Sequence, residues 1–214
     1  VGTASAEFET VDPANLFRRV FNTTPGTHTI SVRATDTSAP FFTAMVMYDN
    51  SEKEVTVLNG GWSGGSSADL YNAGIKDAYS PYQALATYNP DLVVLNIGIN
   101  DSTLGTATMT TSAYKANMQA TIDAVRASGS DLILVIPNEI GNASNTRLAI
   151  FSQIVADLAA ANGVKLIDLR AVLGTYAAAT SAGWMRDVYH MTAAGYGKIA
   201  TAIADVIMPA GVGA

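Results

Sequence analysis

The chain has two histidines, and their sequence surroundings differ. His190 follows Asp187 by three residues in MRDVYHMTAAGYGKIA, just before a helical pattern. A carboxylate this close can fix the tautomer and orientation of an imidazole, as triad chemistry requires. A structural pairing at the start of a helix is the alternative. His28 lies in the alternating stretch GTHTISV, which predicts a half-exposed structural histidine on a strand.

A second group of polar residues follows an apolar run. The stretch LVVLNIGINDST predicts a buried strand that delivers Gly98, Asn100 and Asp101 to the carboxyl edge of a sheet. The Asn100 amide there would be a fixed, uncharged donor, suited to an oxyanion that develops only in the transition state. A simple turn at the end of a strand, where Asn and Asp are common and Asp101 can cap the next segment, is the alternative.

The third candidate is a serine in a glycine-rich stretch. Gly61-Trp62-Ser63-Gly64-Gly65 matches the G-x-S-x-G pattern of a nucleophile elbow. An α/β-hydrolase places its acid and then its histidine after this serine, and Asp187 and His190 do follow Ser63 in that order. An acid only three residues before the histidine fits that fold poorly, however. The same turn could instead direct backbone N–H groups into a site.

The elements that would position these residues change type near residue 55. Before it, short β-branched and aromatic stretches separated by turn formers predict antiparallel strands. After it, helical patterns alternate with short runs that are apolar on both faces, as buried parallel strands require. These runs are 55–58, 92–97, 132–136 and 165–169, and the helices between and after them are expected to be capped by Ser112, Asn145 and Thr192. The sequence therefore predicts an α/β sandwich with a parallel sheet, and ligands at the carboxyl ends of its strands.

Composition excludes several classes of function. The 214 residues, 49% of them hydrophobic, suffice for one main domain and part of a second. With a net charge of −6 and scattered Lys and Arg, the chain has no basic stripe for nucleic acid or an anionic membrane, and its apolar runs are too short to cross a bilayer. The absence of cysteine excludes disulfides and thiolate ligands. Asp101, Asp187 and His190 would be a poor ligand set for a metal, so we expect neither a metal nor a cofactor.

Taken together, the three motifs resemble the SGNH superfamily, also called the GDSL-type esterases. Three of the four sequence blocks of that family match in order across about residues 55–207, namely Asn59-x-Gly61-x-Ser63-Gly64, Gly98-x-Asn100-Asp101 and Asp187-x-x-His190. The resemblance implies a three-layer α/β/α sandwich with a flavodoxin-like parallel sheet. It also implies a serine esterase that needs no metal.

The resemblance gives each candidate residue a role. His190 would be the general base and Asp187 the acid that orients it. The N–H of Gly61 and Nδ2 of Asn100 would be the donors of the oxyanion hole. Ser63 would then lie beside the hole and not act as the nucleophile.

The chain departs from the family at the nucleophile. The family serine lies in a G-D-S block at the end of the first sheet strand, and no such block occurs here. The nearest stretch, MVMYDNSE, lacks the glycine and is joined to 55–58 by a connection too short for a parallel crossover. In the flavodoxin-like order, loss of the first strand would leave an open slot between 55–58 and 92–97. We therefore expect that strand and its serine to come from sequence upstream of Val1, on a longer parent chain or a cleaved companion chain.

The expected domains are 1–50, part of an antiparallel β-sandwich, and 51–214, an SGNH-type hydrolase domain without its first strand. A sandwich inserted in this place is similar to that of SGNH deacetylases on phage tailspikes, where the module binds polysaccharide. This resemblance implies removal of O-acyl groups, with acetyl as the expected acyl group, from a polysaccharide, a location outside the cell or on a virion tail, and a homotrimer. A noncatalytic carbohydrate-binding or assembly module on an SGNH scaffold, and an α/β-hydrolase with Ser63 as nucleophile, remain the alternatives.

Overall fold

The computed structural model of the chain describes residues 22–24, 26–29, 31, 55–61, 63–70 and 81–208. Almost all of the expected domain 1–50, the stretch MVMYDNSE included, lies outside these residues, so the β-sandwich stays a prediction. None of the described helices is long and apolar enough to cross a membrane.

A parallel sheet forms the centre of the described structure. Its three strands, in the order β1-β2-β3, are β1 (Leu92–Asn96), β2 (Asp131–Ile136) and β3 (Lys165–Asp168). Leu92 of β1 lies opposite Asp131 of β2, and Ile133 of β2 lies opposite Lys165 of β3. The three strands correspond to the runs predicted at 92–97, 132–136 and 165–169.

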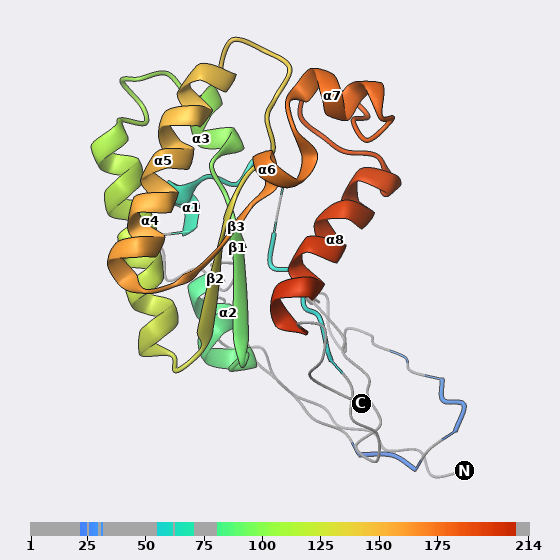
Figure 1. The fold of residues 1–214 in the computed structure, drawn as a ribbon. Helices are drawn as coiled ribbons and strands as arrows, with labels where there is room; N and C mark the ends of the chain where they lie inside the picture. The colour runs from blue at the N-terminus through green and yellow to red at the C-terminus, as the bar shows by residue number, and fades with distance from the viewer. Residues whose placement is uncertain are drawn as a thin grey trace, which may run out of the picture.

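Side chains of β2 are buried on both faces of the sheet. Leu132, Leu134 and Ile136 pack in one apolar cluster with α4 (Thr111–Ala127) and α5 (Asn145–Asn162). Ile133 and Val135 pack in a second cluster with residues of α8 (Ala193–Ile207). The sheet is thus covered by α4 and α5 on one face and by α8 on the other, which confirms the predicted three-layer α/β/α fold (Figure 1).

Capping residues define where the long helices begin. The hydroxyl of Thr192 accepts the N–H of Gly195 and caps α8, as predicted. The α4 helix begins at Thr110, whose hydroxyl accepts the N–H of Ala113, so the predicted cap at Ser112 is wrong by two positions. Asn145 is likewise the first residue of α5 and not its cap.

The predicted strand at 55–58 is not formed. Residues 55–61 have no regular secondary structure, and the side chains of Val55 and Val57 are 75% and 84% exposed. A β-branched run becomes a strand only when a neighbouring strand supplies its hydrogen bonds. Among the described residues β1 pairs with β2 alone, so 55–58 has no strand partner there.

The short helices gather mostly at one end of the sheet. The carboxyl end of β1 leads into α3 (Ile99–Thr103), and that of β3 leads into α6 (Leu169–Leu173) and α7 (Tyr176–Ser181). The first turn of α8 lies at this same end, whereas α2 (Pro81–Tyr88) lies near the start of β1 (Figure 1). A single turn of helix, α1 (Ser67–Leu70), completes the described elements. The connections that carry the predicted site residues therefore share the carboxyl end of the sheet.

Candidate active site

Asp187 and His190 are in direct contact in the loop between α7 and α8. Nδ1 of the imidazole lies 2.9 Å from Oδ2 and 3.0 Å from Oδ1 of the carboxylate. The carboxylate also accepts the backbone N–H groups of Tyr189 at 2.9 Å and of His190 at 2.8 Å. These two backbone bonds are the main reason why the pKa of Asp187 lies below its ordinary value. The ionised carboxylate can only accept, so Nδ1 carries the proton in this contact and Nε2 is the nitrogen suited to proton transfer.

Backbone hydrogen bonds and the buried Met191 at its end fix the shape of this loop, while the pair itself is exposed. The side chain of His190 is 57% exposed and that of Asp187 is 41% exposed. The loop closes on itself where the N–H of Arg186 donates to the carbonyl of His190 at 2.8 Å and the N–H of Thr192 donates to the carbonyl of Trp184 at 2.8 Å. The pair is therefore open to a large ligand while its own geometry is held by short-range contacts.

Asn100 lies at the start of α3, directly after β1. Gly98 precedes this helix with φ of +133°, and a Cβ there would lie 2.9 Å from Oη of Tyr114. Only glycine fits this sharp turn without strain. Nδ2 of Asn100 donates one N–H to the carbonyl of Gly65 at 2.8 Å. A primary amide has two N–H groups, so the second remains for an oxygen of a ligand.

Asp101 is fully buried and joins α3 to the start of α1. Its two carboxylate oxygens accept the N–H of Ser67 at 3.0 and 3.1 Å, and Oδ1 also accepts the Ser67 hydroxyl at 2.5 Å. The Ser67 hydroxyl in turn accepts Nδ2 of Asn117 at 3.2 Å. Burial is the largest influence on Asp101 and raises its pKa, while the bonds from Ser67 oppose that shift. The position of Asp101 suggested a cap for the segment that follows it, but its carboxylate instead bonds to Ser67, which lies earlier in the chain.

Ser67 is the structural residue of the site that the sequence reasoning missed. Nothing in the glycine-rich motif indicated a bond between Ser67 and Asp101. Through Gly65 and Ser67, the turn at 63–67 makes contacts with two consecutive residues, Asn100 and Asp101. The backbone of this turn is thereby held next to the Asn100 amide.

Gly61 and Ser63 lie in the exposed part of the same stretch. The N–H of Gly61 donates to Oδ1 of Asn59 at 3.0 Å, so an oxyanion at this position would have to replace the asparagine oxygen. Between Ser63 and His190, both among the described residues, the structure has no hydrogen bond. The contacts to Asn100 and Asp101 come instead from Gly65 and Ser67.

The predicted residues thus form two groups at the carboxyl end of the sheet. Asp187 and His190 form one, and Asn100 with the 63–67 turn forms the other. The loop 137–144 that follows β2 borders both: a Cβ on Gly98 would lie 3.7 Å from Cγ of Pro137, and the N–H of Gly141 donates to the carbonyl of Val188 at 2.9 Å. In the described part of the chain, no three or more His, Cys, Asp or Glu side chains converge as metal ligands.

Comparison with known proteins identifies the family. The sequence profile of the GDSL-like lipase/acylhydrolase family matches residues 28–198, which is most of the chain. The chain belongs to this family. Membership supports a carboxylic ester hydrolase and agrees with the SGNH motifs. The match begins inside the segment expected to form the β-sandwich, and the division at residue 50 stays a prediction.

Several solved structures resemble this GDSL-like acylhydrolase. The acetyl xylan esterase AlAXEase is 25% identical, with a TM-score of 0.56 over 69% of this chain and 79% of that one. A GDSL-like lipase from Bacteroides thetaiotaomicron is 18% identical, with a TM-score of 0.55 over 68% and 72%. Axe2, an acetylxylan esterase from Geobacillus stearothermophilus, is 20% identical, with a TM-score of 0.53 over 68% and 69%. The last two share the fold of the family. A comparison with curated proteins finds no match.

Proposed function

We propose that this acylhydrolase removes O-acetyl groups from a polysaccharide by a serine mechanism. The observation that carries the proposal is the contact between Nδ1 of His190 and the carboxylate of Asp187, 2.9 Å long, in a loop at the carboxyl end of the sheet. The resemblance to AlAXEase, an acetyl xylan esterase, supports acetyl as the acyl group and acetylated xylan as the first substrate to test. The exposure of the imidazole also suits a polymer, because a polymer cannot enter an enclosed cavity.

The proposed reaction has two stages. A serine hydroxyl attacks the acetyl carbonyl carbon while Nε2 of His190 takes its proton, and Asp187 stabilises the imidazolium. The imidazolium then returns the proton to the sugar oxygen as the C–O bond breaks, which leaves an acetyl-enzyme. Water attacks this ester in the same way, and acetate leaves.

The oxyanion that develops in both stages needs fixed donors. The free N–H of Asn100 is one, since its other N–H is held by Gly65. The N–H of Gly61 is the proposed second donor, and it must exchange Asn59 for the oxyanion when substrate binds. The buried bond between Asp101 and Ser67 keeps the turn and the Asn100 amide together during this exchange.

The nucleophile is proposed to come from a strand supplied by upstream sequence or by a companion chain. Support comes from exposed apolar side chains: Val55 and Val57 are 75% and 84% exposed, and Val94 of the edge strand β1 is 36% exposed. A strand inserted between β1 and residues 55–58 would cover them and bring its carboxyl end beside Asn100. The virion-tail location and the homotrimer are further proposals that rest on the tailspike resemblance alone.

Acetate release from acetylated xylan by the full-length protein tests the function. His190→Ala is expected to lower kcat by about 10³-fold or more, because the base is lost while substrate binding is kept. His28→Ala is the matched control, since it removes the only other histidine and should leave kcat unchanged. Full activity of His190→Ala would refute the proposal.

A phosphonate probe that labels active-site serines tests the origin of the nucleophile. We expect the labelled peptide to come from outside the 63–67 turn. Labelling of Ser63 would instead assign the nucleophile to the glycine-rich stretch. Failure to label any serine, together with no acetate release, would favour the noncatalytic carbohydrate-binding alternative.

A further inference from the structure

The loop 137–144 supports the loop that carries His190. The N–H of Gly141 donates to the carbonyl of Val188 at 2.9 Å. Nδ2 of Asn142 donates to Oη of Tyr189 at 2.7 Å. Two consecutive residues directly before His190 are therefore attached to this loop. The side chains of His190 and Asp187 are 57% and 41% exposed, so these attachments, together with the buried Met191 next to His190, determine where the imidazole lies.

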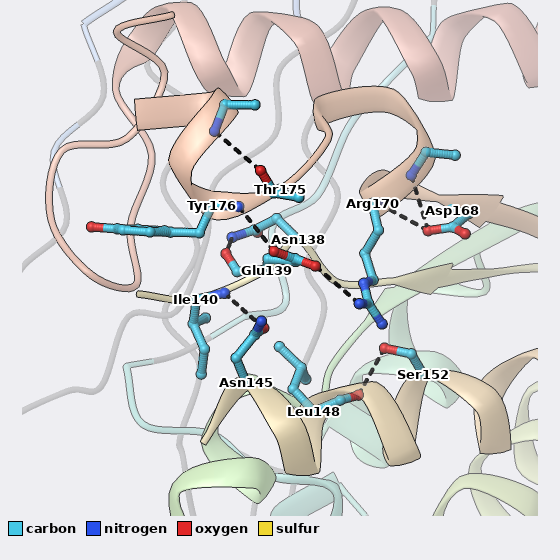
Figure 2. Close-up of polar contacts among 12 residues, drawn as sticks. Asn138, Glu139, Ile140, Asn145, Leu148, Ser152, Asp168, Arg170, Thr175 and Tyr176 are labelled. Carbon is cyan, nitrogen blue, oxygen red and sulfur yellow. Dashed lines mark hydrogen bonds and ion pairs between the residues drawn. The ribbon is translucent and has the colours of Figure 1, made fainter. Parts of the chain in front are cut away.

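Glu139, in the same loop, connects it to two helices. Oε1 of Glu139 accepts Nη2 of Arg170 in α6 at 3.0 Å, and Oε2 accepts the N–H of Tyr176, the first residue of α7, at 3.0 Å. Figure 2 shows the carboxylate between these two partners. The side chain of Glu139 is only 16% exposed. The N–H of Tyr176 is the main cause of the lowered pKa of Glu139, so both oxygens remain acceptors at neutral pH.

Tyr176 also touches the loop through its ring. A Cβ added to Gly141 would lie 2.3 Å from Cζ of Tyr176, so the backbone of the loop lies directly against the ring. The N–H of Trp184, where the His190 loop begins, donates to the carbonyl of Ala179 in α7 at 2.9 Å. Glu139 thus fixes the start of α7, and α7 leads into the loop that Gly141 and Asn142 hold from the other side.

We propose that Glu139 is a positioning residue for the general base, which it places by holding the 137–144 loop and the start of α7 against each other. This inference rests on the proposed function, in which His190 takes the proton of the nucleophile. The pair of Asp187 and His190 is contained within four consecutive residues. Loss of Glu139 is therefore expected to move the pair as a unit and to leave the contact between its two members intact.

The expected effect is a loss of kcat without a change in acid–base behaviour. A displacement of a reacting group by about 1 Å can lower the rate by about 10²-fold. In the full-length protein, Glu139→Ala is expected to lower kcat by about 10- to 100-fold, with KM changed by less than about 3-fold. The pH at which kcat falls on the acid side should stay the same, because Asp187 still holds Nδ1 of His190.

Companion variants separate the contacts that are responsible. Arg170→Met removes the ion pair but keeps the bond to Tyr176, and should keep kcat within about 3-fold of wild type. Asn142→Ala removes the bond to Tyr189, together with the bond that Oδ1 of Asn142 accepts from the N–H of Ser144 in the same loop. It should lower kcat by about 3- to 10-fold, which tests the same support even if Glu139→Ala folds poorly. Glu139→Gln keeps the shape and one acceptor, and should recover most of the kcat that Glu139→Ala loses.

Asn162→Ala is the control for general destabilisation. Asn162 ends α5, away from the site, and its side chain bonds to Gln119, Arg126 and the carbonyl of Leu158. It should lower Tm to a similar extent as Glu139→Ala while kcat stays unchanged. An equal loss of kcat in Asn162→Ala, a shifted acid limb in Glu139→Ala, or full kcat in a folded Glu139→Ala would overturn the inference. If Glu139→Ala does not fold, full kcat in Asn142→Ala would overturn it. Activity that survives in His190→Ala would instead refute the proposed function.

Discussion

Replacement of Asp101 by Asn tests how the 63–67 turn is fixed beside Asn100. In the native protein Oδ1 accepts both the N–H and the hydroxyl of Ser67, at 3.0 and 2.5 Å, and Oδ2 accepts the same N–H at 3.1 Å. The Asn side chain keeps one oxygen and puts an NH₂ group in place of the other. That group cannot accept the Ser67 N–H, and it is enclosed in a site with no access to water.

The expected loss of stability follows from these contacts. The bonds from Ser67 favour the charged carboxylate, but burial opposes it more strongly and raises its pKa, so loss of the charge itself is not expected to cost stability. A buried NH₂ without an acceptor costs about 1–3 kcal/mol. We therefore expect Asp101→Asn to lower the free energy of unfolding by about 1–3 kcal/mol at pH 7.

The same variant has an expected pH dependence. Because burial raises the pKa of Asp101 in the folded state, its protonation favours folding. The contribution is complete below the ordinary value of 3.8 and is lost as the pH rises through the folded pKa. Asn cannot take up this proton. The difference in unfolding free energy between wild type and Asp101→Asn should therefore be larger near pH 4 than at pH 7.

Urea unfolding followed by far-UV circular dichroism measures these differences. Asp69→Asn is the matched control, because Oδ2 of Asp69 accepts the N–H of Ser66 at 2.8 Å and its hydroxyl at 2.6 Å, yet the residue is exposed. In the control, water can take the place of the lost acceptor, so we expect a loss below about 1 kcal/mol. Equal losses in the two variants would show that burial of Asp101 is not the source of the effect, and would refute the reasoning.

Two further predictions concern the turn before α3 and the acid of the pair. Gly98→Ala is expected to lower the free energy of unfolding by about 2–4 kcal/mol, because it strains φ and places a Cβ 2.9 Å from Oη of Tyr114. Gly129→Ala, where φ is +84° and a Cβ meets no atom within 4 Å, should lower it by about 1 kcal/mol. Equal losses in urea unfolding would contradict the contribution assigned to the Tyr114 clash. Asp187→Ala should destabilise the protein most at pH 7 and progressively less as the pH falls below 3.8, because the stability that a lowered pKa contributes is lost as the pH falls through the folded pKa. Melting curves of wild type and Asp187→Ala from pH 2 to 7 check this, and a gap in Tm that persists undiminished at pH 2 would contradict it.

The sequence predicts best where one element determines the outcome. Residues 132–136 are apolar at every position, a short run typical of a strand buried on both faces, and β2 is such a strand. The contact of Asp187 with His190 spans three residues and depends on the conformation of a single loop. Such features depend on one strand or one loop, so the local sequence is enough to predict them.

Contacts between distant segments could not be read in the same way. Ser67 and Asp101 are separated by 34 residues, and nothing in either motif shows that the hydroxyl of one meets the carboxylate of the other. The run at 55–58 has the composition of a strand, but strand formation depends on a neighbour that composition does not supply. The N–H of Gly61, expected to face a ligand, is taken by the side chain of Asn59 two residues before it, a local competition that only coordinates reveal.

The bond between Ser67 and Asp101 also has a consequence for local opening of the fold. The segment 63–70 contributes no residue to either apolar cluster of the sheet, and Ser67 is held by hydrogen bonds to Asp101 of α3 and Asn117 of α4. A segment attached in this way should open more readily than the strands beneath it. The backbone proton of Ser67, enclosed by a carboxylate, is thus a natural reporter: its exchange with deuterium measures how often the glycine-rich turn leaves its place while the rest of the molecule stays folded.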